Sequence, residues 1–337
     1  MHNKLVTLIV MGLSLAGCSV TPSGQQTELP KLHTLYDYAL LDNSGQLVSL
    51  DEVADALTSK QVIFLGEAHS HPGAHLFQMQ MLQALHARHP QLALSMEQFE
   101  TDTQAWLDRY TAGEIGEWTL THYARAWPNY KGSYRPLVDY ARDNNLPVIA
   151  ANAPKDIVVC VGRQGPALLD KLPPNRRINV AKEMDFSQEG AYFEKFIGSM
   201  GGHGNQERPS QRMLNSYAGQ VVRDETMAQS IVNYLTAHPQ SMVVHTNGSF
   251  HSEDHLGTVE RVTRRLDTSV AVIQPVLLDN PQRSDISEDM LQQGDYLLLI
   301  APMSDNVKLP EYQQAWMKSA FTPSNVDCDF SDAAGSE

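Results

Sequence analysis

Gln61-Val-Ile-Phe-Leu-Gly-Glu-Ala-His69 is the stretch that decides the fold. Its first five residues form a near-continuous apolar run, which is typical of a strand buried on both faces in a parallel sheet. Gly66, Glu67 and His69 follow the run directly. Ligands of open parallel sheets bind beyond the carboxyl ends of the strands. This stretch therefore predicts both a parallel sheet and a polar site at its edge.

Five further runs of this kind follow, at Leu92–Met96, Pro147–Ala151, Met242–His245, Val270–Ile273 and Tyr296–Ile300. Segments with helical periodicity lie between them, as in His75–Leu85, Tyr134–Arg142 and Glu225–Leu235. This alternation predicts an α/β fold with a mostly parallel sheet flanked by helices. The long gap over residues 158–236 has helical periodicity without a convincing strand, so we expect a smaller helical insertion domain there.

These boundaries divide the chain into an α/β domain over residues 46–157 and 237–310, the insertion, and a C-terminal tail over residues 311–337. From Pro323 the tail is acidic and rich in small residues, which is the composition of a disordered segment. Cys160 and Cys328 could pair in an oxidising compartment, but nothing in the sequence brings them together.

Polar residues follow four of the predicted strands and would meet at one rim of the sheet. They are Glu67, His69, Glu97, Asn152, Asn247 and His251. Gly66 and Gly248 would let the backbone approach a ligand closely. Such a rim could bind a divalent metal, move protons, or form a network of buried polar groups with a purely structural role. The residues alone leave these alternatives open.

Several function classes are excluded or disfavoured. The formal net charge of −14 argues against a nucleic-acid surface. The sequence contains no GxxxxGK[ST] phosphate loop, no GxSxG nucleophile turn and no HExxH zinc motif. The hydrophobic fraction of 42% is that of a globular protein.

Residues 127–137 form an aromatic and basic stretch that contains Trp127, Tyr130, Lys131 and Tyr134. We expect it to be an open loop before a helix. Tyrosine is one of the axial ligands that haem iron takes in proteins. Tyrosine and tryptophan in a surface loop also serve as packing anchors, and composition alone favours that role.

The N-terminus has the plan of an export signal, with Lys4, an apolar run from Leu5 to Leu15, and small residues before Cys18. The run is shorter than the roughly 20 apolar residues that span a bilayer. Leu15-Ala-Gly-Cys18 has the lipobox pattern of bacterial lipoproteins. We expect a signal peptide over residues 1–17, and lipid, including palmitate, on Cys18. A tether would cover residues 18–45. Ser19 after the cysteine indicates the outer membrane, facing the periplasm.

The chain resembles the ChaN-type cofacial haem-binding lipoproteins, in a superfamily that includes Tiki-like metalloproteases and erythromycin-esterase-like proteins. The resemblance rests on an ordered set of motifs over about residues 60–275. They are Leu65–Gln78, Glu97–Phe99, Trp127–Leu137, Leu146–Pro154, Arg223–Ala228 and Gly248–His251.

The resemblance implies two stacked haems at a homodimer interface, each iron bound by a tyrosine, and an association with an outer-membrane haem receptor in iron uptake. Tyr134 best matches a motif position and Tyr130 is the alternative, with Tyr192 and Tyr217 less favoured. For the haem propionates, the candidates are His203, Lys131 and Lys195. Asp224 belongs to a matching motif and is expected to support the rim.

Two functions remain. The favoured one is a haem-binding protein of the periplasm. The alternative is a metal-dependent hydrolase or protease of Tiki-like type, in which Glu67, His69 and His251 hold Mn²⁺, Co²⁺ or Zn²⁺ and Glu97 orients or deprotonates a water.

Overall fold

The computed structural model describes residues 30–200, 209–279, 286–320 and 325–330. The eight strands are β1 (Tyr38–Asp42), β2 (Leu47–Val48), β3 (Val62–Glu67), β4 (Leu92–Glu100), β5 (Val148–Asn152), β6 (Met242–Gly248), β7 (Val270–Leu277) and β8 (Tyr296–Ile300). They form one sheet in the order β2-β1-β8-β7-β3-β6-β4-β5. The six predicted strands are all present, and β8 to β5 are parallel to one another. The prediction of a mostly parallel α/β sheet is confirmed.

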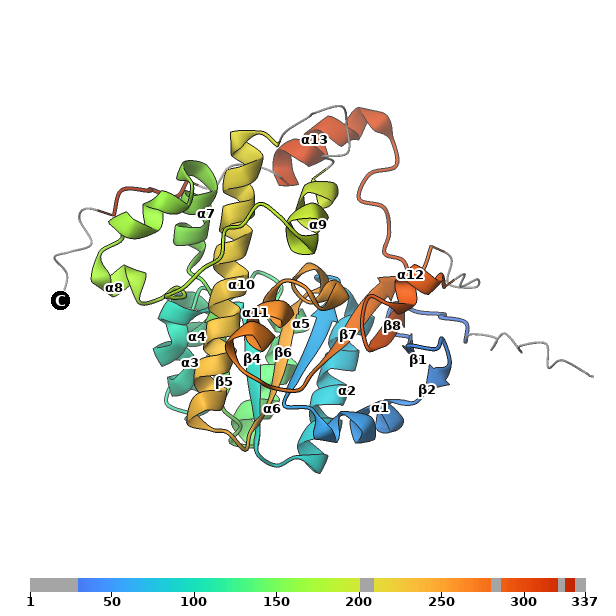
Figure 1. Cartoon of the computed structure of the whole chain (residues 1–337). Helices are drawn as coiled ribbons and strands as arrows, with labels where there is room; N and C mark the ends of the chain where they lie inside the picture. Colours follow the sequence, from blue (N-terminus) through green and yellow to red (C-terminus); the bar gives the residue numbers. More distant parts are fainter. Residues whose placement is uncertain (1–29, 201–208, 280–285, 321–324, 331–337) are drawn as a thin grey trace, which may run out of the picture.

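Helices cover both faces of the sheet (Figure 1). The α-helices are α1 (Leu50–Ala56), α2 (Pro72–Arg88), α3 (Gln104–Thr111), α4 (Glu117–Tyr123), α5 (Tyr130–Ser133), α6 (Arg135–Asp143), α7 (Lys155–Gln164), α8 (Pro174–Arg177), α9 (Ala191–Ser199), α10 (Gln211–Ala237), α11 (Thr258–Arg265), α12 (Glu288–Leu291) and α13 (Pro310–Ala320). Short 3-10 turns are η1 (Leu57–Ser59), η2 (Thr101–Thr103), η3 (Pro166–Lys171), η4 (Ser249–His251) and η5 (Glu253–His255). None of the described helices is both long and apolar enough to cross a membrane.

The apolar run of strand β3 is continuous because both faces of the strand are covered by helices. Ile63 and Leu65 pack in the core beneath α2, which contributes Phe77 among other residues. Val62 and Phe64, which point to the opposite face, pack with residues of α10 and α11. All residues of β3 are buried. Because successive side chains of a strand alternate between faces, a strand covered on both sides needs apolar residues at every position.

Two strands were missed by sequence analysis. Residues Tyr38–Asp42 were assigned to the tether, but they form β1, which pairs with β8 and β2 in antiparallel orientation. Leu40 and Leu41 are buried. The tether prediction is therefore wrong for this stretch. Its five residues are too short to show a clear pattern, and its pairing depends on β8, more than 250 positions later in the chain.

Helix α10 joins the helical part of the molecule to the sheet (Figure 1). Ala218 and Val222, in its first half, pack with Ile157 and other residues of α7. Ala228 and Ile231, in its second half, pack with the sheet. The predicted helical region over residues 158–236 thus contributes its longest helix directly to the core of the α/β domain.

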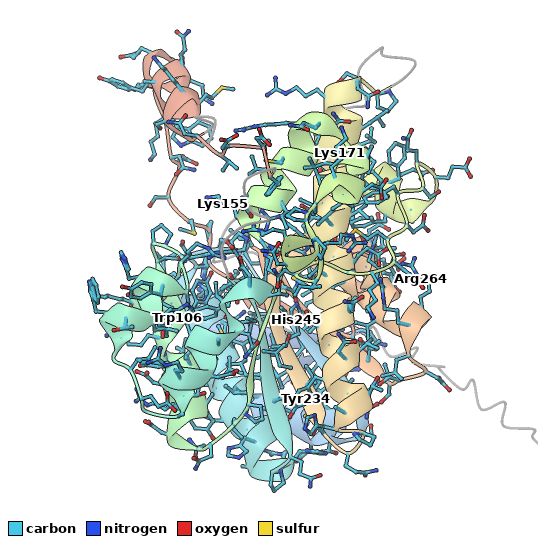
Figure 2. All side chains as sticks on the ribbon, turned by 90° about the vertical axis from the view of Figure 1, so that its left-hand side faces the viewer. Trp106, Lys155, Lys171, Tyr234, His245 and Arg264 are labelled. Atoms are coloured by element: carbon cyan, nitrogen blue, oxygen red, sulfur yellow. A yellow bond between two sulfur atoms is a disulfide. The ribbon has the colours of Figure 1, made fainter. Side chains whose placement is uncertain are left out.

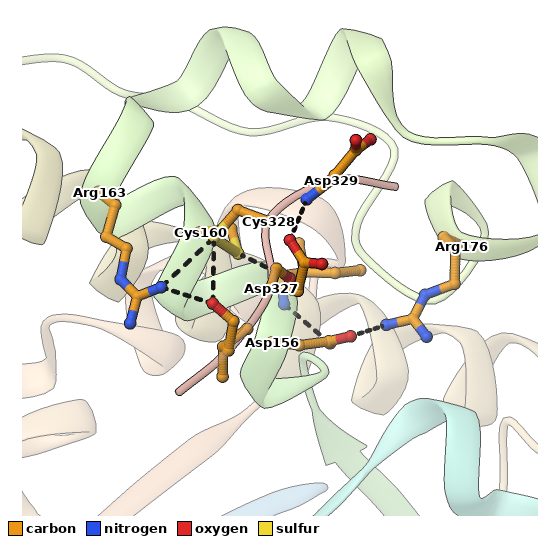
Figure 3. Close-up of a disulfide and its surroundings, with 9 residues drawn as sticks. Asp156, Cys160, Arg163, Arg176, Asp327, Cys328 and Asp329 are labelled. Carbon is orange, nitrogen blue, oxygen red and sulfur yellow. Dashed lines mark hydrogen bonds and ion pairs between the residues drawn. A yellow bond between two sulfur atoms is a disulfide. The ribbon is translucent and has the colours of Figure 1, made fainter. Parts of the chain in front are cut away.

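The C-terminal region is more ordered than its composition indicated. Residues 310–320 form α13, and Cys328 is bonded to Cys160 of α7 (Figure 3). Val326 and Phe330 pack against the cluster formed by α7 and η3. Arg163 of α7 donates a hydrogen bond to the carbonyl oxygen of Val326 at 2.7 Å. The prediction of disorder from Pro323 is therefore wrong for residues 325–330, because a covalent bond and an apolar contact hold this acidic segment in place.

Candidate functional site

The carboxyl ends of β3, β4 and β6 meet at a cavity, as their polar residues predicted. The parallel register places Glu67 of β3 beside Gly248 of β6. The cavity has a volume of about 470 Å³ and is lined by Glu67, Ala68, His69, Glu97, Trp127, Gln220, Arg223, Gly248, Ser249, Phe250 and His251. The strand ends supply its carboxylates and imidazoles, while α10 supplies Gln220 and Arg223. We call it the strand-end cavity.

His69 and Glu67 form the first pair of the cavity. The Nδ1 of His69 lies 2.8 Å from Oε1 of the buried Glu67, and half of the His69 side chain is exposed. The hydrogen bond to Glu67 raises the pKa of His69, against the effect of burial. Trp127 contacts the His69 ring edge-on, with the ring centroids 5.2 Å apart. A carboxylate therefore orients this imidazole, whose other nitrogen, Nε2, is not engaged by Glu67.

Glu67 is held from behind by the core. Tyr134 donates its phenol hydrogen to Oε1 at 2.6 Å, and Gln78 donates to Oε2 at 2.9 Å. His75 lies 3.6 Å from Oε2 and is buried. His71, in contrast, caps α2 and contacts the carbonyl oxygen of Ala301, so it belongs to the fold and not to the cavity.

His251 lies between two acids in the second cluster. Its Nδ1 is 2.7 Å from Asp224, and its Nε2 is 3.4 Å from Glu97. Burial alone would lower the pKa of His251, but the charges and hydrogen bonds of the two carboxylates outweigh it and raise the pKa to about 10. Burial would likewise raise the pKa of Glu97, but the imidazolium holds it well below its usual range.

Both carboxylates of this cluster are fully engaged. The backbone N–H of Gly248 donates to Oε2 of Glu97 at 2.6 Å. Thr258 donates to Oδ1 of Asp224 at 2.8 Å, and the phenol of Tyr192 donates to Oδ2. A metal ion bound here would have to displace the proton that His251 shares with these acids. Within residues 30–200, 209–279, 286–320 and 325–330, no group of three or more His, Cys, Asp or Glu side chains could hold a metal ion.

The two rim glycines are required by the protein itself. A Cβ atom on Gly248 would lie 2.7 Å from Nε2 of His69, and one on Gly66 would lie 2.8 Å from Cδ of Pro275. Both distances are shorter than real contacts allow. Gly248 thus makes room for His69, and Gly66 makes room for the neighbouring strand β7. The close approach of a ligand to their backbone stays a prediction.

The rim amides support the strand ends without lining the cavity. Asn152 donates to the carbonyl oxygen of Glu97 at 3.0 Å, and Asn247 donates to Ser252 at 2.9 Å. The fully buried His245, in the interior of the sheet (Figure 2), contacts Ser95 at 2.9 Å, and burial lowers its pKa to about 4. Asn152 thus joins the end of β5 to β4, and Asn247 joins the end of β6 to the segment that follows it.

The tyrosines predicted to bind iron are in the core. Tyr134 is completely buried and Tyr130 is 2% exposed. Burial, with the nearby charge of Glu67, raises the pKa of Tyr134 further above its ordinary value, which disfavours a phenolate. The expectation that residues 127–137 form an open loop is wrong, because α5 and the start of α6 fold both phenols onto the hydrophobic core.

The other predicted haem contacts are dispersed. Tyr192 and Tyr217 are buried in the cluster around α9. Lys131 is exposed on α5. Lys195 pairs with the carboxylate of Glu253 at 2.8 Å. His203 and Cys18 lie outside the described residues.

Sequence analysis did not predict that Gln220 and Arg223 line the cavity. One indication of this role was present in the sequence, which is that Arg223 is the first residue of one of the motifs behind the family resemblance.

The chain has identifiable relatives. Residues 53–262 match the family model described as haem-binding uptake, Tiki superfamily, ChaN. The protein RETICULATA-RELATED 5 of Arabidopsis thaliana chloroplasts is 26% identical over 274 residues, which cover 76% of this chain and 36% of that protein. The chain thus spans about a third of this curated relative.

The solved structures include ChaN of Campylobacter jejuni, described as showing cofacial haem binding. It is 18% identical, with a TM-score of 0.59, and the match covers 78% of this chain and 97% of that one. This similarity confirms the fold. The erythromycin esterase EreC is 11% identical, with a TM-score of 0.44 and coverage of 84% and 87%, which is too remote to bear on function.

Proposed function

This chain belongs to the ChaN family of haem-binding uptake proteins in the Tiki superfamily, and from that premise we propose that it binds haem at the strand-end cavity. The single observation that carries the proposal is the half-exposed imidazole of His69 in an open cavity, next to Trp127 and Phe250. Family membership supports the ligand, and within the described part of the chain this cavity offers it both aromatic surface and a metal-binding side chain.

The residues of the cavity fit a haem group. A metal-binding histidine usually donates its other ring N–H to a carboxylate, which orients the ring and makes it a better ligand. His69 has this arrangement with Glu67. We therefore propose that His69 would hold the haem iron, with Trp127 and Phe250 excluding water from the macrocycle. When bound, haem would supply an iron centre that the chain stores or passes on.

Tyrosine ligation by Tyr134, which the family resemblance implies, would require that residue to leave Glu67 and the core. A comparison of two variants separates the two ligands. If His69 binds the iron, His69→Ala changes the visible spectrum of the hemin complex and Tyr134→Phe leaves the band positions unchanged. The opposite result would assign the iron to Tyr134.

A homodimer is part of the proposal. Haem held in an open cavity leaves one apolar face uncovered, and a second haem-bearing subunit would cover it. Titration of hemin into the purified protein, followed by absorbance and by light scattering after gel filtration, tests both points. We expect saturable binding and a doubling of mass as hemin is added. Absence of any spectral change would end the proposal of haem binding, and saturation without a mass change would end that of the dimer.

We further propose that the chain is anchored by lipid on Cys18 to the outer membrane, facing the periplasm, where it would receive haem from a receptor. The lipobox supports this location. Mass spectrometry of the mature protein from membranes tests it. Cleavage at any position other than before Cys18, or a cysteine without lipid, would contradict it.

A second candidate is hydrolysis at the same cavity. The Glu67–His69 pair favours it, because a carboxylate-oriented imidazole can accept a proton from water or donate one to a leaving group. Metal analysis of the purified protein, combined with hydrolase assays of wild type and Glu67→Gln, tests this function. Hydrolysis that is lost in Glu67→Gln would support it, whereas no hydrolysis by the wild type would end it.

A further inference from the structure

Arg223 differs from the other charged residues around the strand-end cavity. Its side chain is partly buried and lines the cavity, one helical turn from Gln220 on α10. Its guanidinium has no hydrogen bond or ion pair with any residue in the described part of the chain. None of its nitrogens is among the buried side-chain atoms that lack a hydrogen-bond partner, so the guanidinium is open to the cavity. Among the described residues, Arg223 therefore presents an unpaired cation to any ligand that enters the cavity.

Glu67 and Glu97 line the cavity together with Arg223, and Asp224 follows it on α10, but each of these three carboxylates is engaged elsewhere. Glu67 is engaged by His69, Tyr134 and Gln78. Glu97 accepts from the Gly248 backbone and contacts His251. Asp224, the next residue on α10, is engaged by His251, Thr258 and Tyr192. The acids of the cavity are thus held by the protein interior, and Arg223 is the charged group left to meet a ligand.

We propose that Arg223 is an anion-binding subsite of the strand-end cavity, which holds a carboxylate of the bound ligand. The planar guanidinium can donate two parallel hydrogen bonds to a carboxylate or phosphate. For haem, whose binding here rests on the proposed function, this group is a propionate. The subsite would fix the orientation of the macrocycle, because the acidic edge of haem would have to face α10. The same chemistry would place a smaller acid or phosphate.

The test compares two ligands that differ only in charge. Hemin carries two free propionates, while its dimethyl ester carries none. The proteins are wild type, Arg223→Gln, Arg223→Lys, and the control Arg212→Gln, which removes an exposed arginine from the start of the same helix. Loss of a charge-assisted pair corresponds to about 10- to 100-fold in affinity.

We expect Arg223→Gln to bind hemin about 10- to 100-fold more weakly than wild type, and to bind the dimethyl ester as wild type does. Arg223→Lys should recover part of the hemin affinity, because it keeps the charge without the paired donors, and Arg212→Gln should behave as wild type. Equal hemin affinity of Arg223→Gln and wild type would overturn the proposal. So would an equal loss for hemin and the ester, which would indicate a general disturbance of the cavity.

A second measurement separates this inference from haem binding. If wild type takes up no hemin, the proposed function fails, and the subsite is tested with succinate and with inorganic pyrophosphate alone. In NMR spectra of protein labelled with nitrogen-15 at arginine, each arginine gives an Nε–Hε signal. The signal that is missing from the spectrum of Arg223→Gln belongs to Arg223. A saturable shift of that signal with either anion would support an anion subsite for a ligand other than haem. No shift with both anions would overturn it.

Discussion

Tyr134 donates its phenol hydrogen to Glu67 across 67 positions of the chain, and the bond of 2.6 Å joins the hydrophobic core to the strand-end cavity. Glu67 in turn orients His69. The residue that family resemblance would place on the iron is, in this structure, a residue that positions the carboxylate behind the cavity. Tyr134 thus acts on the cavity through Glu67 in this structure.

Replacing Tyr134 with phenylalanine should lower the free energy of unfolding by about 1–3 kcal/mol, because a buried carboxylate loses a hydrogen bond. Urea unfolding of both proteins measures this loss. Tyr130→Phe is the matched control, because the Tyr130 hydroxyl is buried without a hydrogen-bond partner among the described residues. Its removal should leave stability unchanged or raise it. Equal effects of the two substitutions would contradict the role given to Tyr134.

Gly248→Ala should disturb the cavity more than the fold. The added methyl group would lie 2.7 Å from the half-exposed His69 ring, which would swing away from Glu67. We expect the pKa of His69 to fall towards its ordinary value and hemin affinity to fall about tenfold, with a stability change below about 1 kcal/mol. Proton NMR of the histidine resonances and hemin titration measure these effects.

Gly132→Ala is the control for that substitution, since a Cβ at Gly132 would meet nothing within 4 Å. It should leave both the His69 pKa and the hemin affinity as in wild type. A Gly248→Ala protein with an unshifted His69 would show that the glycine is not needed for the pair.

The cluster around His251 should make stability depend on pH in the alkaline range. The folded-state pKa of about 10 exceeds the ordinary value near 6.5 of the unfolded chain. The stabilisation is therefore complete below about pH 6.5 and is lost as pH rises towards 10, with a slope of at most about 1.4 kcal/mol per pH unit. Urea unfolding between pH 6.5 and 10 should show a steeper decline for wild type than for His251→Gln. Parallel curves would contradict a protonated His251.

The same cluster acts in the opposite direction in acid. The pKa of Asp224 and that of Glu97 are held below their ordinary values, so their stabilisation is present above about pH 4 and is lost as pH falls. Glu97→Gln should therefore flatten the acid side of the stability curve. An unchanged acid slope would show that Glu97 is not paired with His251 in solution.

Reduction of the Cys160–Cys328 disulfide should lower the free energy of unfolding by about 2–4 kcal/mol. The bond joins residues 168 positions apart and holds the C-terminal segment against α7 (Figure 3). Unfolding of wild type with and without reductant measures this loss. Cys160→Ser should have the lower free energy of unfolding both with and without reductant. If a reductant that opens the disulfide left the free energy of unfolding of the wild type unchanged, the disulfide would have no stabilising role.

The local pattern of residues was sufficient to predict six strands and the rim. The segments Val62–Leu65 and Met242–Val244 are buried and wholly apolar, as strands covered on both faces usually are, and this pattern is visible without the fold. The polar residues after β3, β4 and β6 lie together because parallel strands end at one edge. Short segments of the sequence are thus enough to predict which stretches form buried strands, in what order they follow along the chain, and at which edge of the sheet a site lies.

Only the tertiary structure decided which side chains face that site. Tyr134 is aromatic and polar, and its residue type suits a ligand and a core contact equally, but the packing of α5 and α6 places it in the core. Arg223 faces the cavity because α10 crosses the sheet, and Cys328 reaches Cys160 because the C-terminal segment folds back onto α7. These contacts join residues far apart in the chain, and their geometry depends on the packing of whole elements, which no local pattern encodes.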